Sequence, residues 1–248
     1  QRLATLIRPD RSKFESQLET VRSWVPQREE RLPEILTQVA PQWSFWGAVN
    51  EHAELQAEAL GRLGVETRTI IGNDPPGTFT RAQPVLMTPA YSSLPSGHAA
   101  EAYMFSRVMA HLLNPHVPAP PAAAGMPAAP VVQAQLFDSL ETLASRIAEN
   151  RVVAGLHFPV DSAAGFVLAE TLAEYFVARC RTGNVTGRHF NGNRFGARDD
   201  FIDGPALYEG RSPVASCSGE SVPVPHSPLL AFLWAQARTE WQAAGFDC

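Results

Sequence analysis

The sequence predicts an all-α fold, a helical bundle followed by a loop-rich C-terminal extension. Apolar residues recur at helical spacing through most of the first 182 residues. No segment shows strong alternation of polar and apolar residues, and no internal repeat is present. Residues 183–225 lose all periodicity and are rich in Gly, Asn and Ser. We therefore divide the chain into a helical domain, residues 1–182, and an extension, residues 183–248, which packs on that domain and ends in a helix.

The predicted helices follow one another with short interruptions. A capping box from Ser12 to Glu15 opens the first helix, and Pro26 suits the first turn of the second. A Pro/Gly-rich stretch at 72–95 predicts an ordered connection, and the Pro/Ala-rich stretch 115–130 predicts a flexible surface excursion. The remaining helical patterns cover about 43–63, which ends at Gly64, and residues 97–113, 132–154, 160–180 and 228–244.

Composition restricts the class of protein. The chain has 248 residues, 45% of them hydrophobic, which is enough for a sizeable core. A net charge of −5 argues against a nucleic-acid partner, and no apolar run approaches the roughly 18 residues of a membrane span. Three scattered cysteines do not form a disulfide framework or a zinc site. The sequence leaves the compartment open, so we expect a soluble protein, cytoplasmic or exported, with a homodimer among the options.

The stretch from Leu94 to His98 has the properties of an anion-binding helix start. Ser96 can cap the following helix and donate its hydroxyl to an anion, and Gly97 allows the backbone to come close to a ligand. His98 in the first turn feels the positive end of the helix dipole, which favours its neutral, proton-accepting form. Taken alone, the same residues are equally consistent with an ordinary turn and cap.

A second stretch supplies a cation, an imidazole and a carboxylate. Six positions separate Arg151 from His157, and four separate His157 from Asp161, which is one turn if the segment is helical. The arginine fork matches two oxygens of a tetrahedral anion. His157 can bond to phosphorus or vanadium through one ring nitrogen while Asp161 holds the other N–H. The alternative is an arginine and a histidine at a helix end with solvated partners.

Together, Pro95-Ser96-Gly97-His98 and the spaced Arg151, His157 and Asp161 resemble the superfamily that joins vanadium-dependent haloperoxidases, type 2 phosphatidic acid phosphatases and bacterial acid phosphatases. The likeness continues through Ala148–Gly165, where soluble bacterial haloperoxidase-like members are most similar, although Asn150 stands where many members have Ser. It covers roughly residues 30–182 and implies a helical bundle of the haloperoxidase and acid phosphatase type.

The resemblance also implies roles for these residues. His98 would be the acid and base, and Asp161 would steady His157. The leading implied function is that of a vanadate-dependent haloperoxidase-like enzyme, which oxidises halide with peroxide or acts on an organic small molecule. Vanadate, or phosphate in the same pocket, would be held by Ser96, Gly97, Arg151 and His157.

Two other functions stay open. An acid phosphatase or diphosphatase would run through phospho-His157, with His98 protonating the leaving alcohol. A degenerate homologue that has lost vanadate binding would do different chemistry or only bind a ligand. The two enzyme classes share these motifs because phosphate and vanadate have the same shape and charge.

The third possibility arises from a departure upstream. The family's first motif is a Lys followed seven positions later by Arg-Pro, and matching the surrounding prolines places Thr67 and Asp74 at those two cationic positions. A carboxylate beside an anion weakens its binding. Arg68 and Arg81 are possible compensating cations; the alternative is that both are solvated surface arginines. Tyr91 could line a substrate pocket or simply pack in the core.

Overall fold

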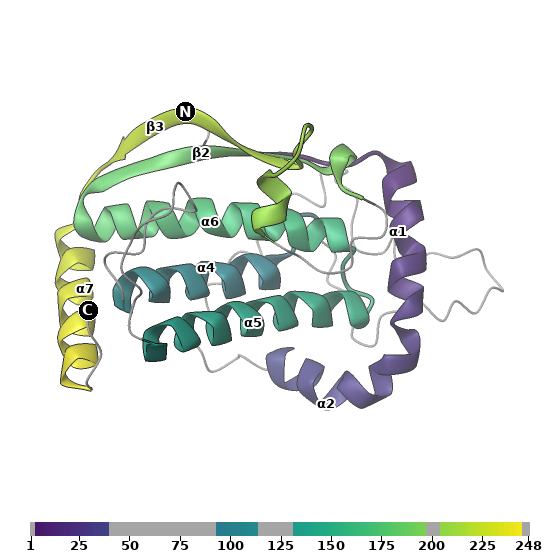
Figure 1. Ribbon diagram of the computed structural model, residues 1–248, viewed down its shortest axis with the longest axis horizontal. Helices are drawn as coiled ribbons and strands as arrows, with labels where there is room; N and C mark the ends of the chain where they lie inside the picture. The colour runs from purple at the N-terminus through teal and green to yellow at the C-terminus, as the bar shows by residue number, and fades with distance from the viewer. Residues whose placement is uncertain (1–2, 40–92, 114–130, 197–203, 245–248) are drawn as a thin grey trace.

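The computed structural model describes residues 3–39, 93–113, 131–196 and 204–244 (Figure 1). Several predicted features lie outside the described residues: the helix at 43–63, most of the connection at 72–95 and the excursion at 115–130. The predicted site residues Arg68, Arg81 and Tyr91 lie outside them as well.

The prediction of a helix-rich chain is confirmed in the described residues. The first helix begins earlier than its predicted capping box, because Asp10 and not Ser12 is the N-cap residue. The other described helices start and end within a few residues of their predicted bounds. The helices are α1 (Arg11–Ser23), α2 (Arg28–Val39), α4 (Gly97–Leu113), α5 (Val131–Val153), α6 (Pro159–Arg181) and α7 (Pro228–Ala243), with short 3₁₀ helices at Val25–Gln27, Gly192–Arg194 and Pro205–Tyr208.

The all-α prediction is wrong in one respect, since a three-stranded sheet is present. Strand β2 (Gly183–Asn191) pairs parallel with β1 (Ala4–Ile7) and antiparallel with β3 (Ala215–Val224). The alternation was hidden because a bulge between Thr186 and Arg188 shifts the register of β2. Val185 and Phe190, five positions apart, are therefore both buried, although a regular strand would turn them to opposite faces.

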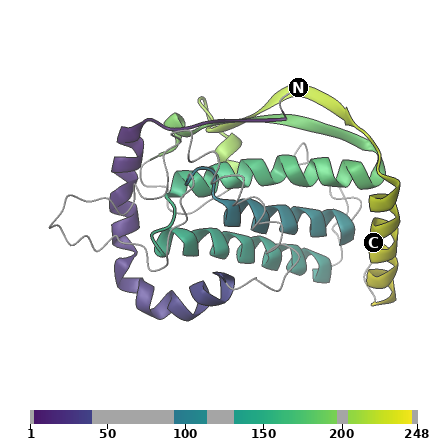
Figure 2. The same cartoon turned by 180° about the vertical axis from the view of Figure 1, so that it is seen from behind.

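Helix α6 is the centre of the fold. It lies between the sheet and helices α4 and α5, while α1 and α7 cross opposite ends of this arrangement in both views (Figures 1 and 2). Small buried residues on α6, among them Ala163, Ala164 and Ala169, allow α4 to pack closely. The first half of α6 is buried on nearly all sides, so α6 is a core helix rather than a surface helix.

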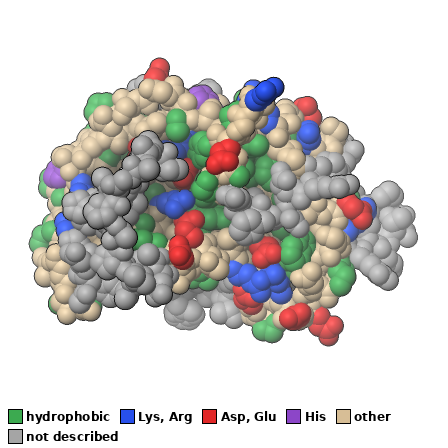
Figure 3. Space-filling model, viewed as in Figure 1, with side chains coloured by type: hydrophobic (Ala, Val, Ile, Leu, Met, Phe, Trp, Pro, Cys, Tyr) green, Lys and Arg blue, Asp and Glu red, His purple; other side chains and the backbone are tan. Residues whose placement is uncertain are grey.

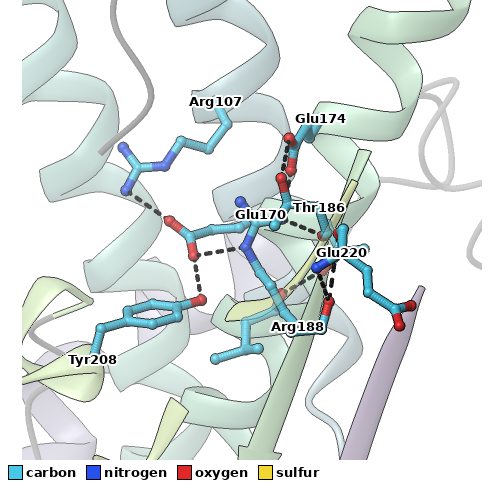
Figure 4. Close-up of polar contacts among 10 residues, drawn as sticks. Arg107, Glu170, Glu174, Thr186, Arg188, Tyr208 and Glu220 are labelled. Atoms are coloured by element: carbon cyan, nitrogen blue, oxygen red, sulfur yellow. Dashed lines mark hydrogen bonds and ion pairs between the residues drawn. The ribbon is translucent and has the colours of Figure 1, made fainter. Parts of the chain in front are cut away.

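A polar cluster attaches the sheet and the C-terminal segment to these helices (Figure 4). Glu170 on α6 lies 3.8 Å from Arg107 of α4 and 3.5 Å from Arg188 of β2, and it accepts a 2.6 Å hydrogen bond from the Tyr208 hydroxyl. Arg188 also pairs with Glu174 at 2.6 Å. Burial and the negative charge of Glu170 raise the pKa of Tyr208. The cluster joins α4, α6, β2 and the 3₁₀ helix at Pro205–Tyr208.

The described part of the surface carries mixed charge. On the face in Figure 3, acidic and basic side chains are interspersed, with hydrophobic side chains between them. Among the helices that the structure describes, none is long and apolar enough to cross a membrane. Within the same residues, no three His, Cys, Asp or Glu side chains gather in a way that could hold a metal ion.

Candidate active site

The turn between α5 and α6 places His157. Gly155 adopts a positive φ of 75°, which a glycine tolerates, and so ends α5 in a left-handed cap. Its N–H bonds the Val152 carbonyl at 2.9 Å. The Arg151 carbonyl then accepts the N–H groups of Leu156, at 3.0 Å, and His157, at 3.3 Å. The backbone of the arginine therefore fixes the backbone of the histidine six positions later.

The carboxylate of Asp161 organises the start of α6. Phe158 is the N-cap residue and Pro159 occupies the first helical position, so His157 lies just before the helix rather than inside it. Asp161 Oδ2 accepts the Phe158 N–H at 2.9 Å and lies 3.5 Å from Nδ1 of His157. One oxygen thus contacts both a helix-capping N–H and the imidazole, which orients the ring with Nε2 on its opposite side.

The start of α4 meets the start of α6 directly. The Ser96 N–H donates to the Asp161 carbonyl at 2.9 Å. The Ser96 hydroxyl accepts the Ala99 N–H at 3.4 Å, which confirms the predicted cap. The contact is close because residue 165 is a glycine: a Cβ there would lie 2.7 Å from the Ser96 carbonyl oxygen. Two segments more than 60 positions apart in the sequence are therefore held together by backbone contacts.

The polar groups at this junction are deeply buried. Ser96, His157 and Asp161 are fully buried, and Arg151 is 1% exposed. Charged side chains are rarely so buried unless they are paired or serve a ligand, because removing them from water is costly. A cluster of a buried cation, a carboxylate and an imidazole at a helix start is the kind of place where functional sites occur.

The other residues of the first stretch occupy the first turn of α4. Gly97 and His98 follow the capping Ser96 directly and are half-buried. The structure thus brings one end of α4 together with the turn between α5 and α6. Six predicted site residues lie in these two segments, namely Ser96, Gly97, His98, Arg151, His157 and Asp161.

Sequence reasoning missed the contribution of α1. Phe14, Gln17 and Val21 form its buried stripe, and Gln17 is fully buried. The Gln17 Oε1 accepts the N–H of Val160 at 2.9 Å, next to Asp161 in the first turn of α6. A glutamine at helical spacing between two apolar residues was the available signal for this contact.

Helix α2 holds the end of α5 in place. The Arg28 guanidinium donates from Nε to the Val153 carbonyl at 2.5 Å, and burial lowers the pKa of Arg28. Asn150 is buried between two side chains of α2: its Oδ1 accepts from Arg31 at 3.0 Å, and its Nδ2 donates to Glu34 at 2.8 Å. The asparagine at the family's usual serine position therefore joins α5 to α2.

The fold and these contacts define a helix-rich protein with a buried arginine in the last turn of α5 and a buried histidine and carboxylate at the start of α6, next to the start of α4. The family model of the PAP2 superfamily matches residues 57–184, just over half of the chain. The chain belongs to the PAP2 superfamily, whose members are enzymes and include phosphatases and haloperoxidases. The match includes α4, α5 and α6 but not α1 or the sheet strand β1. Comparisons with curated proteins and with solved structures gave no match.

Proposed function

We propose that the junction of α4 with the turn before α6 binds a tetrahedral oxyanion, and that the chain works as a vanadate-dependent haloperoxidase-like enzyme. The observation that carries this proposal is the complete burial of His157 and Asp161 beneath the start of α4, joined by the backbone bond between Ser96 and Asp161. Membership of the PAP2 superfamily supports the same class of chemistry.

The chemistry of the available donors fits vanadate and phosphate equally. Arg151 offers a planar fork of N–H groups with a permanent positive charge. The first turn of α4 offers backbone N–H groups and the positive end of a helix dipole, beside the Ser96 hydroxyl. His157 offers a ring nitrogen whose opposite partner faces Asp161. Ser96, Gly97, Arg151 and His157 would hold the anion.

Bound vanadate would supply the means to activate hydrogen peroxide so that a halide ion is oxidised. The residues of the chain have separate tasks. Asp161 faces Nδ1 of His157 and would fix its tautomer, which would leave Nε2 available to hold the anion. His98 takes up the proton that peroxide loses and returns it during turnover. Burial of these side chains lowers the local dielectric constant and strengthens each of these electrostatic contacts.

Phosphoryl transfer is the second candidate, because the orientation of His157 by Asp161 also suits a nucleophile. Nε2 would attack phosphorus, the bond to the ester oxygen would break, and His98 would protonate the departing alkoxide. A water molecule, deprotonated by His98, would then attack the phosphohistidine and release phosphate. This sequence uses the same side chains and only water as the second reactant.

Parallel assays on the full chain distinguish the two reactions. The protein is incubated with orthovanadate and tested for bromination of a dye with bromide and peroxide, and the vanadate-free protein is tested for phosphomonoester hydrolysis. We expect bromination without phosphate release; the opposite result identifies a hydrolase. His157→Ala should abolish turnover without loss of helical content, while His189→Ala, at an exposed histidine of β2, should leave it intact.

One result overturns the proposal altogether. Ligands that bind the folded state raise its melting temperature. If neither vanadate nor phosphate at millimolar concentration protects the wild-type protein against heat, and neither assay gives turnover, the chain is a homologue without this anion chemistry.

A further inference from the structure

The N-terminal segment, residues 3–39, lies before the region that matches the family model, yet it reaches the candidate active site. Figures 1 and 2 both show α1 crossing the end of the fold where α5 ends and α6 begins. Two polar side chains of this segment point to a role there. Gln17 lies on α1, and Arg8 lies between β1 and α1.

Gln17 carries a buried donor that none of the described residues uses. Its side chain is fully buried, and its Oε1 accepts the Val160 N–H, which identifies the oxygen branch of the amide. The Nε2 branch has no hydrogen-bond partner among the residues that the structure describes. A buried N–H without an acceptor destabilises the fold, so its presence next to the first turn of α6 is explained best by a ligand acceptor.

Arg8 is connected to the start of α6 through two aromatic rings, those of Phe14 and Phe158. Its guanidinium carbon lies 5.3 Å from the centre of the Phe14 ring, and the Phe14 and Phe158 rings are 5.0 Å apart. Phe158 is the N-cap residue whose N–H binds Asp161. Burial lowers the pKa of Arg8, and the negative charge of Asp161 opposes this shift, so the two charges interact. Arginine stays protonated nonetheless.

The charges at the site explain why a second cation is needed. Arg151 and Asp161 are both buried and carry opposite formal charges, so together they add no net charge. A phosphate or vanadate ion would add further negative charge, which the helix starts alone offset only in part. Arg8 brings one more positive charge to this end of the fold.

We propose that Gln17 and Arg8 belong to the oxyanion site: Gln17 donates its amide N–H to an oxygen of the ion, and Arg8 supplies a second positive charge. This inference rests on the proposed function, since it requires a bound phosphate or vanadate. It makes α1 and the end of β1 one wall of the site, although both lie outside the matched family region.

Titration calorimetry with orthophosphate, and separately with orthovanadate, tests the proposal on the full chain. Gln17→Glu keeps an oxygen acceptor for the Val160 N–H but removes the donor, and Arg8→Gln removes the charge. We expect each variant to raise Kd at least about tenfold, and Arg8→Lys to restore much of the affinity. The matched controls Gln27→Glu and Arg22→Gln make the same chemical changes at exposed positions and should stay within about twofold.

The outcomes separate this inference from the proposed function. If the wild-type protein binds neither ion, the proposed function fails. If the wild type binds but Gln17→Glu and Arg8→Gln bind equally well, the oxyanion site stands and the role of the N-terminal segment is refuted. Circular dichroism and a melting curve establish that each variant is folded. Should Gln17→Glu not fold, the uncharged Gln17→Met gives the same comparison, and unchanged affinity in it refutes the role of Gln17.

Discussion

Replacing Gly165 with alanine should separate the two halves of the candidate active site. The added Cβ would lie 2.7 Å from the Ser96 carbonyl oxygen, 3.0 Å from Ala99 Cβ and 3.1 Å from the Ala100 nitrogen. Two of these three atoms are backbone atoms, one of Ser96 just before α4 and one of Ala100 within it, so no side-chain rotation relieves the contact. Restoring an ordinary separation of 3.4 Å requires α4 to move by about 0.7 Å.

That displacement has two measurable effects. The 2.9 Å bond from the Ser96 N–H to the Asp161 carbonyl would lengthen beyond hydrogen-bonding distance. Overpacking against backbone costs about 3 kcal/mol, and the better helix propensity of alanine returns about 1 kcal/mol. The net loss of about 2 kcal/mol corresponds to roughly 4–8 °C in Tm for a chain of this size. Affinity for phosphate or vanadate should fall by about 10²-fold, because the anion donors are misplaced.

Thermal unfolding and anion titration of Gly165→Ala measure both effects. Gly183→Ala is the matched control, since a Cβ at residue 183 would lie 3.6 Å from Ala178 Cβ, an ordinary contact. If Gly165→Ala melts at the wild-type temperature and binds phosphate with wild-type affinity, then α4 and α6 do not meet as described, and the argument for a joint site is refuted.

Three further predictions concern stability. Glu170→Gln should lower the free energy of unfolding in urea by about 2–3 kcal/mol, because Arg188 loses a buried partner, whereas the exposed Glu240→Gln should change it by less than about 0.5 kcal/mol. Burial raises the pKa of Tyr103 to about 12, so this side chain ionises in the unfolded chain before it ionises in the folded one, and the free energy of unfolding should fall above pH 10. Between pH 8 and pH 11, Tyr103→Phe should lose about 1.4 kcal/mol less of this free energy than the wild type does. Asn150→Ala should cost about 1–3 kcal/mol in the same urea titration, and an unchanged midpoint would contradict the role of this amide in joining α5 to α2.

Periodicity and capping residues predicted the helices well because each of these signals is local. The apolar stripes of α4 to α6 and the Ser96 cap depend on residues within one or two turns. The αL glycine at residue 155 and Pro159 marked the turn that carries His157. The spacing predicted that His157 and Asp161 lie close together, and they do, although His157 precedes α6 and the two residues are not joined by one helical turn.

The sheet and the N-terminal wall could not be predicted in the same way. The partner of β1 lies more than 180 positions away, and the bulge after Thr186 removes the period-two signal from β2. The contacts of Gln17 and Arg8 depend on how α1 is docked against α6; the apolar spacing around Gln17 indicates that it is buried but not which helix it contacts. Arg68, Arg81 and Tyr91 stay predictions, since they lie outside the described residues.

The parallel pairing of β1 with β2 has a consequence for biosynthesis. Residues 4–7 align with residues 188–191, so β1 waits for its neighbour until more than 180 further residues have left the ribosome. Closing so long a loop is slow, and the exposed edge of the waiting strand is vulnerable to wrong pairing in the meantime. A truncated product that stops before residue 183 would therefore carry α4, α5 and α6 of the family region and still lack β2, the strand that pairs with β1 in the described part of the chain.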